Sequence, residues 1–314
     1  MCEKSLYTKK KGTVWGRVKR EVIKNKFLYI MAAFIIAWYA IFYYGPMFGL
    51  VIAFREYNVA QGFFAGNWVG LKYFKEFFNG LYFWRTLRNT FLISFYDLVF
   101  GFPAPIIFAL LLNEIKNAKF KKTVQMVTYL PHFVSMVVIC GLIADFFSTD
   151  GIITQIITFF GGAEKNYLGE AQYFRRIHVG TNIWQMVGWS SIIYLAALSG
   201  VDQELYEAAS IDGAGRFRKL ISITIPGIAS TIIVMLILRI GQILTVSYEK
   251  IILLYSPGTY ETADVISSYV YRMGLGGARY SYSTAVGIFQ SVVNVILVVT
   301  ANFASKKFTE TSLF

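Results

Sequence analysis

Cysteine and histidine, which proteins use for disulfides, metal binding and acid–base chemistry, are rare in this sequence of 314 residues. Each occurs twice, as Cys2 and Cys140 and as His132 and His178. Two distant cysteines cannot build a disulfide framework, and we expect both to be inert. The histidines lie far apart without neighbouring ligands, so the sequence predicts no metal site, and His132 beside Pro131 is expected to be a packing residue.

The motifs of an ATP-hydrolysing enzyme are also missing. A P-loop needs G-x-x-x-x-G-K-[ST], because backbone amides and a lysine together hold the phosphates. The dipeptide Gly-Lys occurs nowhere in the chain. No nucleophile, base and orienting acid stand at a recognisable spacing. We therefore expect no catalytic residues and no cofactor bound by this chain itself.

Charge is scarce as well. Charged residues make up 15% of the chain, against roughly 25% in ordinary globular domains. Hydrophobic residues make up 56% and aromatic residues 18%, which is typical of a protein that crosses a membrane several times. The net charge of +12 would suggest nucleic acid as a partner of a soluble protein. In a membrane protein it mainly sets orientation and contacts lipid headgroups, so we expect membrane lipids and no nucleic acid as partners.

Six apolar runs approach the roughly 20 residues that cross a bilayer. They predict an all-α, polytopic membrane protein with six transmembrane helices, expected at residues 27–54, 89–112, 123–147, 181–201, 227–247 and 283–304. We expect a kink at Gly45-Pro46 in the first helix and a break at Pro103 and Pro105 in the second. The remaining organisation is a basic tail at 1–26, an outer segment at 55–88, a five-helix core at 89–305 and a tail at 306–314.

Basic residues are distributed unevenly between the two sides of the expected helices. The segments on the side of the N-terminus hold 18 of them and the opposite segments hold 11, with Arg239 left inside a helix. By the positive-inside rule, both termini and the loop at 205–226 are expected in the cytoplasm. Segments 148–179 and 248–282 are then expected outside, and the first of them includes a short amphipathic helix at 152–160.

The loop at residues 205–226 is the most informative stretch of the sequence. Helix-favouring residues run through Glu207 to a break at Asp212-Gly213, and helical spacing then resumes. We expect two helices joined by a turn in which Gly213 adopts a positive φ and Asp212 caps the second helix. Pro226 is expected to begin the next membrane helix. Local physics alone fits an ordinary surface hairpin equally well.

The order of residues in this loop is more specific than its helix pattern. E-A-A-x-x-D-G-A followed by I-x-x-P resembles the EAA loop of permease subunits of ABC importers. The matching residues are Glu207, Ala208, Ala209, Asp212, Gly213, Ala214, Ile223 and Pro226. In that family the loop is the coupling helix, which lies in a cleft of the ATPase subunit. The resemblance implies that Glu207 contacts the ATPase and that Gly213 is the pivot of the turn.

The resemblance extends along the chain. YYGPMFGLVIAF, NWVGLKYF, GFPAPIIFALLLNE, FKKTVQMVTYLPHF and residues 287–298 are similar to carbohydrate-uptake importers for complex oligosaccharides and polysaccharide fragments. This implies a maltose-permease-like type I importer fold in a bacterial plasma membrane. It also implies a second, related permease as a heterodimer partner, two ATPase subunits that bind ATP and Mg, an extracellular solute-binding protein and an oligosaccharide substrate.

A sugar path should contain planar hydrogen-bonding side chains and aromatic faces. On the fourth expected helix, one face carries Trp184, Gly188 and Ser191, with Gln185, Trp189 and Tyr194 beside them. On the sixth, Gln290 and Asn294 stand four residues apart. These two amides either line the path or form hydrogen bonds between helices.

Arg239 and Gln242 share a face of the fifth expected helix. A guanidinium inside a bilayer is costly, so we expect Arg239 to face a water-filled path or a carboxylate. In maltose-type relatives the matching region lines the transported sugar, which implies that both residues do so here. A guanidinium binds a carboxylate in bidentate fashion, so such a path would favour an acidic glycan. The alternative for Arg239 is a structural ion pair with Asp97.

Two other functions compete with an importer permease. A transporter driven by an ion gradient would need intramembrane acids, for which only Asp97 and Asp145 qualify. A membrane scaffold would leave the polar faces of the fourth and fifth helices unexplained. The EAA loop favours the permease over both.

Overall fold

The computed structural model describes residues 21–309, which form two compact units. The first unit comprises residues 21–52 and 57–66, and the second comprises residues 53–56 and 67–309. Cys2, most of the expected basic tail and the last five residues lie outside the described chain. Within residues 21–309 the structure is helical, and its one β-type contact is an isolated antiparallel bridge between Arg55 and Trp68.

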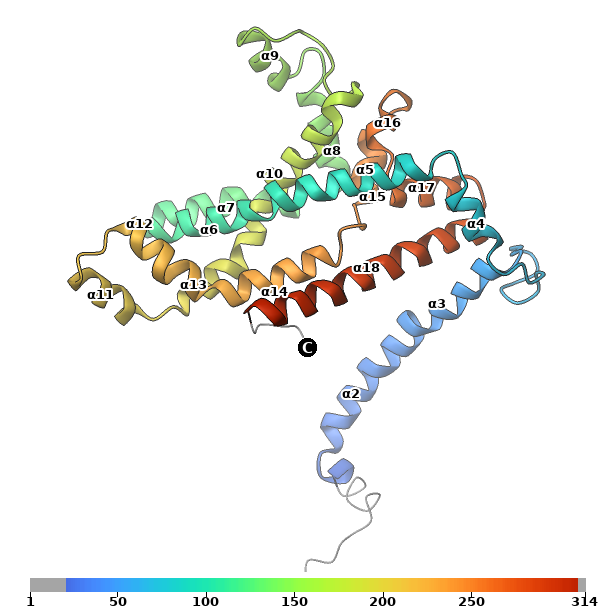
Figure 1. Ribbon diagram of the computed structural model, residues 1–314, viewed down its shortest axis with the longest axis horizontal. Helices are drawn as coiled ribbons and strands as arrows, with labels where there is room; N and C mark the ends of the chain where they lie inside the picture. The colour runs from blue at the N-terminus through green and yellow to red at the C-terminus, as the bar shows by residue number, and fades with distance from the viewer. Residues whose placement is uncertain (1–20, 310–314) are drawn as a thin grey trace, which may run out of the picture. The chain divides into compact units, whose positions relative to one another are not determined.

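The first unit is a long apolar helix with a π-turn. It consists of α2 (Lys26–Tyr39), η1 (Ala40–Tyr44), α3 (Gly45–Met47) and most of η2 (Phe48–Phe54) (Figure 1). Its side chains are apolar on all sides, as in a helix that contacts lipid. In η1 the Gly45 amide donates to the Ala40 carbonyl, five residues back. This wide turn lies just before Pro46, which has no amide hydrogen to donate.

The second unit contains all the remaining elements. They are α4 (Lys72–Phe78), α5 (Phe83–Tyr96), η3 (Asp97–Gly101), α6 (Pro103–Glu114), α7 (Ala118–Phe133), α8 (Met136–Phe146), α9 (Ile152–Phe159), α10 (Ala171–Ser199), α11 (Gln203–Ile211), α12 (Arg216–Lys219), η4 (Leu220–Thr224), α13 (Ile225–Gly227), α14 (Ala229–Ile240), α15 (Tyr248–Leu254), η5 (Pro257–Thr259), α16 (Tyr260–Ala263), α17 (Ile266–Tyr271), η6 (Arg272–Gly276) and α18 (Tyr280–Thr309).

The 29-residue helix α10 organises this second unit. It packs against α6 and α7, and α14 packs along α18 (Figure 1). Near its start, Phe174 and Ile177 are buried with side chains of α5, α8 and α15. Near its end, Tyr194 and Leu198 are buried with Ala109 of α6. The polar side chains of the middle of α10 are thereby held between several helices.

Three helices of the described chain are long and apolar enough to cross a membrane, at Lys26–Phe54, Phe83–Glu114 and Tyr280–Lys307. Two bent pairs, α7 with α8 and α12–α13 with α14, raise the number to at most five. α10 is long enough, but polar residues such as Asn182, Gln185 and Ser191 make it less apolar than these. It also begins ten residues before the expected start of the fourth span.

The third span, expected at 123–147, consists of two helices, and the fifth, expected at 227–247, ends early. α7 and α8 meet at an angle of 103°. The chain bends here because the backbone of Val134 is extended. Ser135 then begins a new helix as its N-cap, since its hydroxyl accepts a hydrogen bond from the Val138 amide. α13 and α14 meet at 61°, and α14 ends at Ile240 rather than at residue 247. The seven residues that follow form turns and extended backbone.

The expected break of the second span at Pro103 and Pro105 is also wrong. The helix continues from Phe83 to Glu114, because the π-turn η3 accommodates the first proline. The Phe102 amide donates to the Asp97 carbonyl five residues back. A third π-turn, η4, lies in the same position relative to Pro226.

Candidate functional site

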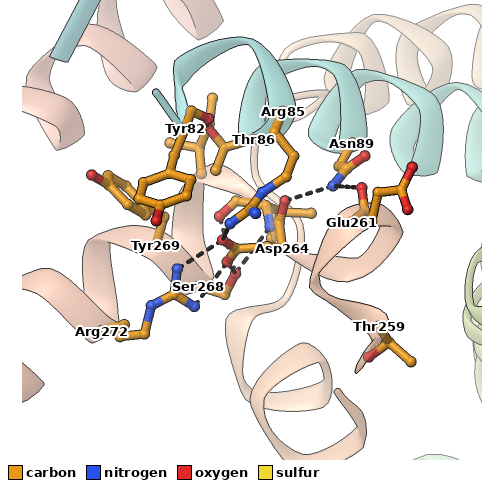
Figure 2. A network of polar contacts seen from close by, with 12 residues as sticks. Tyr82, Arg85, Thr86, Asn89, Thr259, Glu261, Asp264, Ser268, Tyr269 and Arg272 are labelled. Atoms are coloured by element: carbon orange, nitrogen blue, oxygen red, sulfur yellow. Dashed lines mark hydrogen bonds and ion pairs between the residues drawn. The ribbon is translucent and has the colours of Figure 1, made fainter. Parts of the chain in front are cut away.

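A buried polar network fixes the segment after α15 to α5. The carboxylate of Asp264 is fully buried and accepts hydrogen bonds from Arg85, Ser268 and Arg272, as Figure 2 shows. The ion pairs are 3.0 Å long to Arg85 and 2.7 Å long to Arg272. Burial alone would lower the pKa of the Arg272 guanidinium. Its hydrogen bond and ion pair with Asp264 have the larger effect, so the pKa of Arg272 is raised. Two cations around one buried acid make this junction rigid.

The amide of Asn89 connects the same junction to α10. Its Nδ2 donates to the main-chain carbonyls of Glu261 and Asp264, at 2.9 and 3.0 Å. Its Oδ1 accepts a 2.8 Å hydrogen bond from Arg175 of α10. Three segments that are far apart in sequence are therefore held together, and a polar cavity begins one helical turn further along α5 and α10.

This cavity has a volume of about 160 Å³ and lies among α5, η3, α8, α10, α14 and α15. Its polar lining residues are Ser94, Asp97, His178, Asn182, Arg239, Gln242, Thr245, Ser247 and Lys250. The irregular backbone after α14 forms one wall. Non-helical backbone at membrane depth is tolerated where it lines a cavity or is buried in protein. The cavity is therefore the candidate substrate site.

Asp97 and Arg239 form an ion pair at the wall of this cavity. Asp97 Oδ1 also accepts a 2.7 Å hydrogen bond from Nδ2 of Asn182. Residue 101 is a glycine, which leaves room for this carboxylate against η3. A Cβ at position 101 would lie only 2.7 Å from Asp97 Oδ1. The structure thus contains the ion pair that the sequence offered as an alternative for Arg239. The same guanidinium still lines the cavity together with Gln242.

Gln290 and Asn294 of α18 form hydrogen bonds with the segment after α14. Gln290 Nε2 donates 2.7 Å to the Leu244 carbonyl. Asn294 accepts from the Leu244 amide at 3.3 Å and donates to the Thr245 hydroxyl at 2.9 Å. Of the two roles considered for these amides, the contacts correspond to hydrogen bonding between helices, because they join α18 to the chain that follows α14.

The face predicted on the fourth helix is divided by its neighbours. Gly188 lies so close to α7 that a Cβ would stand 2.3 Å from the Thr128 carbonyl oxygen, and Ser191 is fully buried. Trp184 and Trp189 are exposed, and Trp189 stacks on the ring of His132 with centroids 4.4 Å apart. None of these four α10 residues lines the cavity. For them a place on the substrate path stays a prediction.

Lys250 is a cavity residue that the sequence analysis left in an outer segment. Its side chain is 1% exposed, and burial lowers the pKa of its amine to about 8. The sequence held one sign of this burial. Lys250 lies three residues after the irregular segment at 241–247 and shares a face of α15 with the buried Leu254. Its burial depends on the packing of α15 against α8 and α17, which no local pattern reveals.

No group of three or more possible metal ligands occurs among residues 21–309. His178 lies in the cavity wall, and its Nδ1 has no hydrogen-bond partner in the described chain. His132 contacts Met186 and Trp189, as expected of a packing residue.

The loop at residues 205–226 is a rigid hairpin. Helix α11 is capped at its start by Asp202, whose Oδ1 accepts a 3.0 Å hydrogen bond from the Glu204 amide. It ends in a Schellman motif, in which the Ala214 amide donates to Ala209 and the Gly213 amide donates to Ser210. Gly213 has a φ of 73°, as the sequence predicted.

The predicted capping role of Asp212 is wrong. Helix α12 begins at Arg216 with Gly215 at its N-cap and no side-chain cap, and Asp212 instead is the C-cap of α11. The Schellman turn uses up the residues directly after Asp212, so the second helix starts too late for its carboxylate to reach.

Side-chain contacts join the two arms of the hairpin while leaving its tip exposed. Lys219 Nζ donates 2.6 Å to the Ser210 hydroxyl, and the hydroxyls of Tyr206 and Thr224 lie 2.9 Å apart. Glu207 and Ala208 are exposed. Ile211 is 87% and Phe217 73% exposed, so the tip offers an apolar surface beside an acid. Such a surface suits contact with another protein.

Apolar helices around a polar cavity, with an exposed hairpin beside them, form an architecture that suits a membrane transport subunit. Residues 81–310 match the family described as binding-protein-dependent transport system inner membrane component. The chain therefore belongs to this family of importer permeases, whose role is transport rather than catalysis. This confirms the predicted all-α importer-permease fold and the predicted role as an importer permease, and it excludes the gradient-driven transporter and the scaffold.

The chain is similar to characterised relatives along nearly its whole length. It is 45% identical to protein LplB of Bacillus subtilis (strain 168), over 97% of this chain and 95% of LplB. It is 43% identical to the polygalacturonan/rhamnogalacturonan transport system permease protein YteP of the same organism, over 95% and 93%.

Two solved structures are similar at 42% identity. One is a bacterial ABC transporter involved in the import of the acidic polysaccharide alginate, with a TM-score of 0.86 over 93% of this chain and 99% of that chain. The other is the bacterial alginate ABC transporter in complex with alginate pentasaccharide-bound periplasmic protein. Its TM-score is 0.87, over 95% and 100%.

Proposed function

We propose that this chain is the permease subunit through which an ABC importer takes up oligosaccharides or fragments of an acidic polysaccharide. The observation that carries this proposal is the likeness to the alginate importer at 42% identity over nearly the full length of both chains. A second relative, YteP, is named for polymers that contain uronic acids. The charged groups that line the cavity are Asp97, Arg239 and Lys250, and their net positive charge supports an acidic substrate.

The proposed assembly contains a second, related permease, two ATPase subunits and an extracellular solute-binding protein. ATP and Mg bind to the ATPase subunits and not to this chain. Glu207, Ala208, Ala209, Asp212, Gly213 and Ala214 form the ATPase-coupling surface. The exposed hairpin tip and its Schellman turn support this role, because a rigid element transmits displacement between subunits.

The proposed location is the bacterial plasma membrane, with both termini and the α11 hairpin in the cytoplasm. The excess of lysine and arginine in the segments on that side supports this orientation. Closure of the ATPase dimer would then move the coupling hairpins together and open the cavity to the outside, where the binding protein delivers the glycan.

The test is reconstitution of the purified complex, tagged on this chain, into proteoliposomes with its solute-binding protein. We expect an ATPase and a second permease to copurify, and alginate and galacturonate oligosaccharides to stimulate ATP hydrolysis and uptake. A neutral pentasaccharide of glucose should stimulate ATP hydrolysis less and compete only weakly with the acidic oligosaccharides. Uptake of the neutral oligosaccharide that acidic ones do not inhibit would contradict an acidic substrate. Uptake without ATP by this chain alone would contradict the whole assembly.

A further inference from the structure

The cavity contains a cation without a matching acid. Lys250 is one of the largest fully buried side chains of the described chain. Within residues 21–309, its ammonium donates a 3.5 Å hydrogen bond to the main-chain oxygen of His178 and interacts electrostatically with the Cys140 thiol. An ammonium has three donors and is seldom buried without a carboxylate. Two of the three donors are therefore available to a group inside the cavity.

The one acid that lines the cavity is already engaged. Asp97 forms the ion pair with Arg239 and accepts the hydrogen bond from Asn182. It makes no ion pair with Lys250. The charged lining groups thus sum to one positive charge. The His178 imidazole adds a second buried nitrogen, Nδ1, that has no partner in the described chain.

We propose that Lys250 binds the carboxylate of a uronate unit while the glycan occupies this cavity, and that it thereby selects acidic over neutral glycans. This inference rests on the proposed function. An anion in the cavity would balance the charge of Lys250 and supply acceptors to its free donors, with Ser247 and Gln242 nearby in the lining. The volume of about 160 Å³ far exceeds the roughly 10–15 Å³ that one water needs. A carboxylate and its water molecules therefore fit.

Arg239 has a different role in this arrangement. The positive charge of its guanidinium is already balanced by the Asp97 carboxylate. The charge of Lys250 has no such partner among the cavity residues. The selective residue is accordingly the lysine, and the arginine shapes the cavity wall.

The experiment compares an acidic glycan with its neutral twin in the complete reconstituted importer. The probes are alginate pentasaccharide and the same pentasaccharide with its carboxylates reduced to alcohols, both delivered by the solute-binding protein. The variants are Lys250→Met, which keeps the length and removes the charge, and Lys250→Gln, which keeps a polar end. Lys72→Met is the control, because Lys72 is an exposed lysine paired with Glu56 away from the cavity.

We expect both Lys250 variants to raise the KM for uptake of the acidic pentasaccharide by about tenfold or more. For the reduced pentasaccharide the KM should stay within about twofold, as should both values in Lys72→Met. Equal changes for the two probes, or no change for either, would overturn the role of Lys250. Failure of both neutral variants to assemble would assign the lysine to folding and also overturn it. If the unmodified complex takes up neither probe, the proposed function itself fails, and this result is distinguishable from the others.

Discussion

Asp97 in η3 and Arg239 in the last turn of α14 form an ion pair across the cavity wall, although 142 positions separate them in the chain. The pair links two membrane helices. Arg239 also lies at the C-terminal end of its helix, where the helix dipole favours a cation.

Neutralising one partner of this pair should destabilise the protein. In Asp97→Asn, Arg239 loses its counterion inside the membrane domain. We expect a lower midpoint of thermal unfolding in detergent. The loss should be smaller than the roughly 3–5 kcal/mol typical of fully buried pairs, because the Arg239 side chain is 44% exposed. The double variant Asp97→Asn/Arg239→Gln should recover part of the loss. A double variant less stable than both single ones would refute the pairing.

Replacement of Arg239 alone should not change selectivity. Since Asp97 holds its guanidinium, Arg239→Gln should reduce uptake of acidic and neutral glycans by similar factors. The measurement is the ratio of uptake rates for the two pentasaccharides in proteoliposomes. A selective loss of the acidic one would show that Arg239 contacts the substrate carboxylate directly.

Glu207 should be required for coupling and not for folding. We expect Glu207→Ala to abolish the stimulation of ATP hydrolysis by the loaded binding protein while membrane insertion stays normal. Glu204→Ala is the matched control, because Glu204 is an exposed acid on the same helix, in its first turn. Equal loss in both variants would indicate a nonspecific charge effect.

Gly213 should tolerate asparagine better than alanine. Its φ of 73° is left-handed, which costs an alanine roughly 1–2 kcal/mol, whereas asparagine visits this region more readily. No other group lies within 4 Å of a Cβ built there, so the effect is one of backbone strain. We expect stimulated ATP hydrolysis to fall in Gly213→Ala and to be largely kept in Gly213→Asn. Unaltered activity in both would exclude a rigid turn as the coupling element.

Gly188 should be essential for the packing of α10 on α7. A Cβ at this position would lie 2.3 Å from the Thr128 carbonyl oxygen, whereas one at Gly180 of the same helix meets nothing within 4 Å. Gly188→Ala should therefore lower the unfolding midpoint, and Gly180→Ala should leave it unchanged or raise it slightly. The two midpoints, measured side by side in detergent, test the contact directly. Matching shifts would contradict it.

Local order sufficed to predict the hairpin at residues 205–226. Its turn is specified by neighbouring residues, so Gly213 adopted the expected conformation, and only the cap at Asp212 was misplaced by a turn that uses three more residues than expected. The pairing of Asp97 with Arg239 could be suggested because each is a rare charge in an apolar run. Lys250 could not be found in this way, because its burial arises from α15 packing against α8 and α17.

The span boundaries were less predictable for a similar reason. An apolar run indicates that a segment can enter a bilayer but not that it is straight. The sharp bend at Ser135 depends on one cap, and the end of α14 at Ile240 depends on amides from α18 that satisfy the chain beyond it. A hydropathy pattern predicts neither the bend at Ser135 nor the end of α14.

The π-turns before Pro46, Pro103 and Pro226 have a consequence for how side chains are aimed. Each such turn contains one residue more than an α-helical turn, which rotates all following side chains by roughly 100° about the helix axis. η4 lies between the hairpin tip at Gly213 and α14, so it contributes to the angular position of Arg239 on α14. Removing one residue from η4 would leave both elements intact and point the guanidinium toward a different neighbour. The π-turn before Pro226 thus fixes the rotation of α14 relative to the hairpin that precedes it.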